Sequence, residues 1–208
     1  RIGATANSVA YYGVVKEKIK DSGKTTDKAA VAVDAFGSMF AELSVDALMG
    51  LTIGIEYAPD AMAIKETRSI NGREESVVAA GSGTDANSTQ TITINISDSY
   101  TAYVSMPIPG VEGLYVRAGV QSMDIITKEN LATGSSYGNE TLNGVQIGIG
   151  YEHDINDRFF VRTEGLYTNF DDIAINGSQV GGTAGSYNRV SADDLGSASA
   201  RLSLGLKF

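Results

Sequence analysis

The residues of this 208-residue chain that could do chemistry are charged side chains within segments that alternate between apolar and polar residues. Successive side chains of a strand point to opposite faces, so each charge shares a face with small and polar residues. The acids are Glu42, Glu56, Glu152 and Glu164, and the bases are Arg117, Arg162, Arg201 and Lys207. Buried charges persist when they are paired. We expect these side chains to pair in an interior as a structural plug, in preference to a conducting path; the alternative is that some lie unpaired on solvent-exposed rims.

Catalytic and metal-binding residues are scarce. The single histidine, His153, falls on the apolar face with Ile149 and Tyr151, and a Ser-His-Asp arrangement has no second imidazole to use. The acidic pairs 171–172 and 193–194 could offer oxygen ligands to Ca²⁺, but their spacing matches no known calcium loop. We therefore predict no enzymatic activity, no cofactor and no metal site.

Composition narrows the class of protein. Apolar residues make up 42% of the chain, yet no run reaches the ~18 to 20 apolar residues of a membrane-spanning helix. The net charge of −9 argues against nucleic-acid binding, and the lysine-rich stretch 16–28 is expected to be a solvated loop. The absence of Cys is compatible with export, and a start at Arg1 without Met or an apolar leader predicts either a mature, processed protein or a chain trimmed at its start. The length predicts a single domain, residues 1–208.

Eight alternating segments recur along the chain, and several reach the ~9 to 11 residues of a tilted transmembrane strand. They are 2–15, 35–45, 51–68, 91–106, 114–127, 142–153, 159–169 and 197–208. The connections alternate between short (46–50, 107–113 and 154–158) and long (16–34, 69–90, 128–141 and 171–196). Short turns at one end and long polar loops at the other are typical of outer-membrane barrels.

This pattern predicts an all-β fold: an antiparallel, up-and-down transmembrane barrel of about eight strands. The rival fold is a soluble lipocalin-like barrel, whose interior would be apolar. Pro59 interrupts the third segment and predicts a bulge or bend, because proline has no N–H for a ladder. Tyr11 and Tyr12 are adjacent and cannot both lie on one face, so the register of the first segment stays open.

The last segment reads LSLGLKF and places Leu202, Leu204, Leu206 and Phe208 on one face. It resembles the terminal strand of bacterial outer-membrane barrels, in which a final Phe is part of the signal for the barrel-assembly machinery. The stretches GIEYAPD (54–60) and GIGYEHDINDRFFVRTEG (148–165) are similar to strand–turn–strand elements of small Gram-negative barrels of the OmpA-type, OmpW-like and Opa-like superfamily. The chain departs from these proteins in having no Trp for an interfacial girdle and no peptidoglycan-binding domain.

The resemblance implies an outer-membrane location, with short turns in the periplasm and long connections outside. Membrane lipid and the barrel-assembly machinery are the implied partners, together with extracellular partners of the long connections. The function expected first is a non-enzymatic structural or surface-interaction barrel with a plugged lumen. The second hypothesis is a passive small-solute channel, through the lumen or through a lateral opening near Pro59. The third is a soluble lipocalin-like binder.

Overall fold

The computed structural model describes residues 1–18, 25–70, 88–130, 138–180 and 187–208. Nine strands and one short 3₁₀ helix occupy these ranges: β1 (Ile2–Lys18), β2 (Thr25–Val45), η1 (Asp46–Leu48), β3 (Leu51–Ile70), β4 (Ser88–Pro107), β5 (Leu114–Asn130), β6 (Glu140–Asp154), β7 (Phe159–Phe170), β8 (Ile173–Val180) and β9 (Tyr187–Leu206). No helix in the described part of the chain is long and apolar enough to cross a membrane.

The strands close into an antiparallel barrel in the order β1-β2-β3-β4-β5-β6-β7-β9, and β9 pairs with β1 to complete the circle. This confirms the predicted eight-stranded, up-and-down barrel. Strand β8 lies outside that circle and pairs with β9 alone among the described strands. Sequence analysis missed β8 because its short alternation, with Ile173 and Ile175 on one side, lies among the Gly, Ser and Asn of a stretch expected to be a loop.

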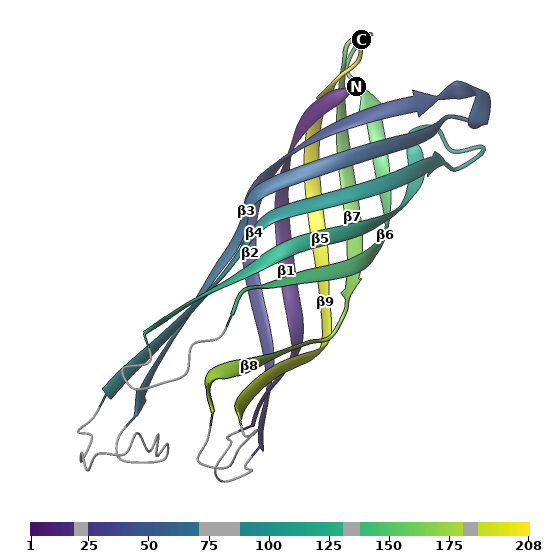
Figure 1. Cartoon of the computed structure of the whole chain (residues 1–208). Helices are drawn as coiled ribbons and strands as arrows, with labels where there is room; N and C mark the ends of the chain where they lie inside the picture. The colour runs from purple at the N-terminus through teal and green to yellow at the C-terminus, as the bar shows by residue number, and fades with distance from the viewer. Residues whose placement is uncertain (19–24, 71–87, 131–137, 181–186) are drawn as a thin grey trace, which may run out of the picture.

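The connections sort by length between the two ends of the barrel. Both termini and the short turns lie at the upper end in Figure 1, and the strands that lead into the long connections run to the lower end. The strands extend further into those connections than the alternation indicated. Strand β1 reaches Lys18 and β2 begins at Thr25, so the described part of the stretch 16–34 is strand rather than solvated loop. In the expected loop 171–196, strand β8 and the start of β9 form a hairpin.

Burial is inverted relative to a soluble protein. The outer face carries exposed large apolar residues, among them Ile55, Val120, Val145 and Ile147. The interior at the short-turn end holds buried charged and hydroxyl side chains, including Arg117, which is 3% exposed. A lipocalin-like barrel would place apolar residues inside and polar ones outside. The alternation therefore sorts the faces as a transmembrane barrel requires.

Inward-facing aromatic rings lie over glycines on the neighbouring strand. Tyr103 covers Gly54 and Phe160 covers Gly205, and each pair is in direct register. A Cβ at either glycine would clash with the ring opposite. Glycine at these positions therefore makes room for large side chains inside a narrow barrel.

Two irregular segments are resolved by the structure. The ladder between β3 and β4 shifts register between Asp60 and Met62, just after Pro59, as expected for a bulge. In β1, Tyr11 packs inward and stacks on Phe170, with ring centroids 6.4 Å apart. The hydroxyl of Tyr12 instead hydrogen-bonds that of Tyr167 on the outer face. The adjacent tyrosines thus divide between the two faces.

Candidate functional site: paired charges in the barrel lumen

Four of the eight predicted residues form one group, here called the inner tetrad: Glu56, Arg117, Glu164 and Arg201. Arg201 donates from Nη2 to Glu56 Oε1 at 2.6 Å, and Arg117 donates from Nη2 to Glu56 Oε2 at 3.0 Å. Arg117 Nη1 reaches Glu164 Oε1 at 3.1 Å, and Arg201 Nε lies 3.7 Å from Glu164 Oε2. All four side chains are buried and their formal charges cancel.

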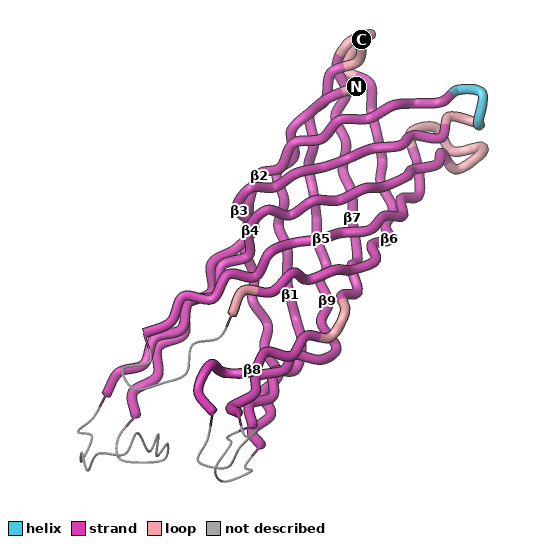
Figure 2. The backbone as a smooth tube through the Cα atoms, in the orientation of Figure 1, coloured by secondary structure: helices cyan, strands magenta, loops and turns pink. Residues whose placement is uncertain are grey.

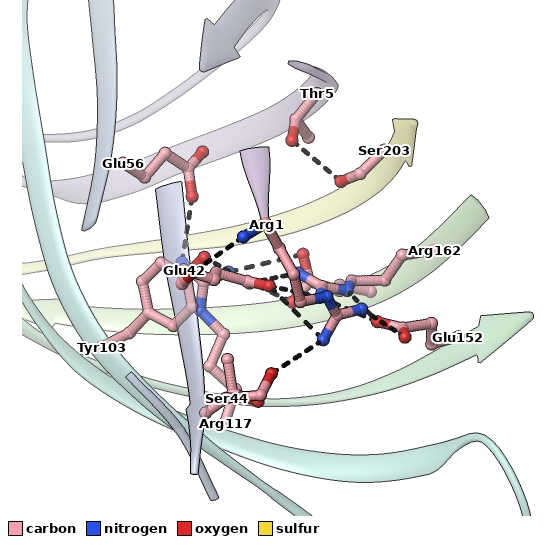
Figure 3. Close-up of polar contacts among 12 residues, drawn as sticks. Arg1, Thr5, Glu42, Ser44, Glu56, Tyr103, Arg117, Glu152, Arg162 and Ser203 are labelled. Atoms are coloured by element: carbon pink, nitrogen blue, oxygen red, sulfur yellow. Dashed lines mark hydrogen bonds and ion pairs between the residues drawn. The ribbon is translucent and has the colours of Figure 1, made fainter. Parts of the chain in front are cut away.

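A second group lies nearer the short turns and is here called the rim tetrad: Arg1, Glu42, Glu152 and Arg162. Arg162 binds both oxygens of Glu42, at 2.7 Å and 2.9 Å, in the bidentate geometry that makes guanidinium–carboxylate pairs strong. Its Nη2 also donates to Glu152 Oε2 at 2.8 Å, and Arg1 pairs with Glu152. Figure 3 shows these side chains converging from different strands.

Arg1 was missed by sequence analysis. A signal was present, since Arg1 shares its strand face with Gly3 and Thr5, which are small or polar like other inward positions. Besides its bond to Glu152, the guanidinium of Arg1 lies 3.7 Å from Glu42 Oε2 and 4.2 Å from the centroid of the Phe160 ring.

Tyr103 links the two tetrads. Its hydroxyl donates to Glu42 Oε1 at 2.6 Å, and the guanidinium of Arg117 lies 3.5 Å from its ring centroid. Arg162 is likewise surrounded by the rings of Phe40, Tyr115 and Phe160, at 5.1 to 5.4 Å. A cation over an aromatic face is stabilised by the ring quadrupole, most strongly away from water. The charges are therefore held by aromatic rings as well as by each other.

Lys207, the eighth predicted residue, lies at the edge of this network. Its side chain is 29% exposed and pairs with Asp154, which is itself 58% exposed. Its Nζ is 4.0 Å from Glu152 Oε1. Lys207 is therefore a rim residue at the short-turn end.

Next to the inner tetrad, on the side toward the long connections, the lumen is polar and uncharged. Gln146 Nε2 donates to Thr168 Oγ1, which donates to Gln121 Oε1, and Gln121 Nε2 donates to Ser99 Oγ. This chain of hydrogen bonds crosses from β6 through β7 and β5 to β4. A cavity of about 30 Å³ lies beside it and touches Arg201 and Glu56 of the inner tetrad. That volume exceeds the ~10 to 15 Å³ that a buried water molecule needs.

An apolar layer follows the polar one and was not predicted. Its buried members are Ile96, Met123, Ile125, Leu142 and Phe170, with Tyr11, Ala32, Phe36, Ile173 and Leu195 packed against them. Met123 is almost completely buried. The bulge between Ser97 and Tyr100 in β4 shifts the alternation there, and it places Ile96 inside.

The remaining candidates lie outside the lumen. His153 is exposed beside a short turn. At the long-loop end, the hydrogen bond from Lys16 to Asp193, 2.6 Å long, raises the pKa of Lys16 above its ordinary value, and Asp172 accepts from the backbone N–H of Asp194. Within the described ranges, no three His, Cys, Asp or Glu residues gather as metal ligands.

The expected assembly signal lies on the outer face of the last strand. Leu202 and Leu204 are exposed there. Strand β9 ends at Leu206, so Phe208 follows the strand instead of lying in it and is highly exposed. Recognition by the assembly machinery stays a prediction.

A charged, hydrogen-bonded interior inside an apolar exterior is the arrangement of a barrel whose outer wall faces lipid, and toward the short turns every strand of the closed wall is paired with both neighbours. The described strands form a transmembrane β-barrel.

No protein-family model matches the sequence, and no curated protein matches it. Among solved structures, the chain is similar to Neisserial surface protein A (11% identity, 99% of this chain and 97% of that chain, TM-score 0.42). It is also similar to Ail, the attachment invasion locus protein of Yersinia pestis, in complex with the heparin analogue sucrose octasulfate (14%, 99% and 99%, 0.41). A third is the outer membrane protease OmpT from Escherichia coli (8%, 99% and 97%, 0.46). Similarities this low assign neither an activity nor a ligand to this chain.

Proposed function

We propose that the chain is a non-enzymatic outer-membrane protein with a structural or surface-interaction role, whose lumen does not conduct. In this proposal the barrel is a scaffold that holds the long connections outside the cell, where they meet extracellular partners. The barrel-assembly machinery is the proposed partner during insertion. The only histidine, His153, is exposed beside a short turn, which supports a role without histidine-based catalysis.

The observation that carries the proposal is the filling of the lumen by the two tetrads. Ion pairs run across the barrel as well as along its wall: Glu42 on β2 binds Arg162 on β7, and Arg117 on β5 binds Glu56 on β3. An ion that passed through would have to separate these charges in a site of low dielectric, where unpaired charges cost several kcal/mol.

The apolar layer supports the same proposal independently. It packs side chains from β1, β2, β4, β5, β6, β7, β8 and β9 against each other toward the long connections. A hydrophobic constriction opposes ion passage because the ion would have to lose its water. The tetrads therefore fill the lumen where the barrel wall is closed, and the apolar layer lies beyond them toward the long connections.

Conductance in a planar bilayer tests the proposal. The unmodified barrel, with folding checked by heat-dependent gel mobility, should give no stable unitary current steps. The matched variants are Met123→Ala, which thins the apolar layer, and Lys207→Ala, which removes a partly exposed rim charge. Both should remain silent, since each leaves the tetrads in place. Unitary steps from the unmodified protein would contradict the plug and support the channel alternative.

A further inference from the structure

Strands β2 and β3 are joined over only part of their length. Their ladder runs from Val45↔Leu51 to Met39↔Tyr57 and then ends. Strand β2 nevertheless extends back to Thr25 and β3 extends on to Ile70. Beyond the last shared pair, the described ladders join β2 only to β1 and β3 only to β4. We call this separation the β2–β3 seam.

The sequence explains where the seam begins. If the register continued past Met39↔Tyr57, Gly37 would lie opposite Pro59. Proline has no N–H to donate, and glycine gives a strand neither a side chain to pack nor conformational restriction. The bulge between Asp60 and Met62 then changes the course of β3 while it stays paired with β4. At the base of the seam, Ser38 Oγ donates to Glu56 Oε1 at 2.6 Å, so the inner tetrad holds the last closed part of the wall.

The seam divides the long-loop end into two arms, which are visible in both traces of the backbone (Figures 1 and 2). One arm contains β1, β2, β8 and the start of β9, and the other contains the ends of β3 and β5 and the start of β4. Among the described strands, each arm has one edge at the seam that no ladder joins to another strand. The edge of β2 is also apolar on its outer face, with Val31 73% and Val33 70% exposed.

A free strand edge presents unpaired N–H and C=O groups and is a template for another strand. We propose that a second copy of this chain covers the seam. The free edge of β2 in each copy pairs with the free edge of β3 in the other, so that two barrels share a reciprocal interface.

The directions of the two edges favour a second copy over a single foreign segment. Strands β2 and β3 run in opposite directions, so one extended segment between them would be antiparallel to one edge and parallel to the other. A two-fold axis along the membrane normal keeps both copies in the same orientation. In this arrangement β2 of each copy is antiparallel to β3 of the other copy, as neighbouring strands are in every described ladder of the barrel.

Engineered cysteines test this interface, because the chain has none of its own. Two differently tagged copies are expressed together in the outer membrane, one carrying Val33→Cys and the other carrying Ala63→Cys, Lys65→Cys or Thr67→Cys in turn. Mild oxidation should produce a heterodimer band for at least one combination. Ile147→Cys on β6, 57% exposed, is the matched control. When it replaces Val33→Cys in the first copy, no heterodimer band should form.

Three results would overturn the proposal, provided that each variant shows the gel mobility of a folded barrel. The first is the absence of any heterodimer with Val33→Cys. The second is a Val33→Cys homodimer as the main product, which would place β2 against β2. The third is efficient closure within a monomer that carries both cysteines, which would mean that the seam closes on itself.

Discussion

Arg201 is held by two carboxylates in a space closed to solvent. It lies 2.6 Å from Glu56 and 3.7 Å from Glu164, and its side chain is 4% exposed. We expect Arg201→Ala to lower the free energy of unfolding by about 3 to 5 kcal/mol, because both carboxylates lose a buried partner. Urea titration in detergent micelles measures the change.

A double-mutant cycle with Glu56→Ala isolates the pairing. The double variant should lose less stability than the sum of the two single variants, since removal of Glu56 also removes a stranded charge. Lys207→Ala is the control, because its partner Asp154 is largely exposed, and it should cost about 0 to 1 kcal/mol. Strictly additive losses at Arg201 and Glu56 would show that the inner tetrad is not a coupled unit.

At the scale of a strand, the depth of a side chain in the membrane should decide its tolerance of charge. Ile147 on β6 and Ile155 in the turn after β6 are 57% and 56% exposed, so they differ in position rather than in exposure. Ile147→Arg should destabilise the barrel by about 2 to 4 kcal/mol if it lies near the bilayer midplane. Ile155→Arg, at the aqueous end, should be nearly neutral. Equal effects would argue against a lipid-covered wall at β6.

Alternation predicts a strand where one face is apolar and the other polar along the whole segment. It fails where the inward face changes from polar to apolar residues. In β6, Val145, Ile147 and Ile149 share one face, and the structure has this segment as a strand of the barrel. The apolar layer escaped prediction because Ile125 and Leu142 continue inward faces that are polar or small nearer the short turns, as at Arg117 and Gln146, and because a bulge in β4 turns Ile96 inward. Pairing across the lumen, as between Glu42 and Arg162, depends on curvature that no local pattern records.

For the molecule as a whole, orientation in the membrane is the main expectation to test. The strands that lead into the long connections run to one end of the barrel, and both termini lie at the other (Figure 1). External protease on intact cells should therefore cut between Ile70 and Ser88. The connection 171–196 is a poorer target, because its described residues include the paired strands β8 and β9. Cleavage confined to 46–50 or 154–158 would reverse the topology.

The ladder between β1 and β9 has a consequence for the order of folding. Most other ladders of the barrel join strands that follow each other in the chain, and the β7–β9 ladder skips only β8. The β1–β9 ladder instead joins the first strand to the last. Its residues Thr5 and Ser203, whose hydroxyls lie 2.8 Å apart, are separated by 198 positions in the sequence. Contacts between distant residues carry the largest loop-closure entropy and form late. We expect the hairpins to assemble first into an open, curved sheet, and the β1–β9 ladder to form in the final step. Substitutions along that ladder should consequently speed unfolding more than they slow folding.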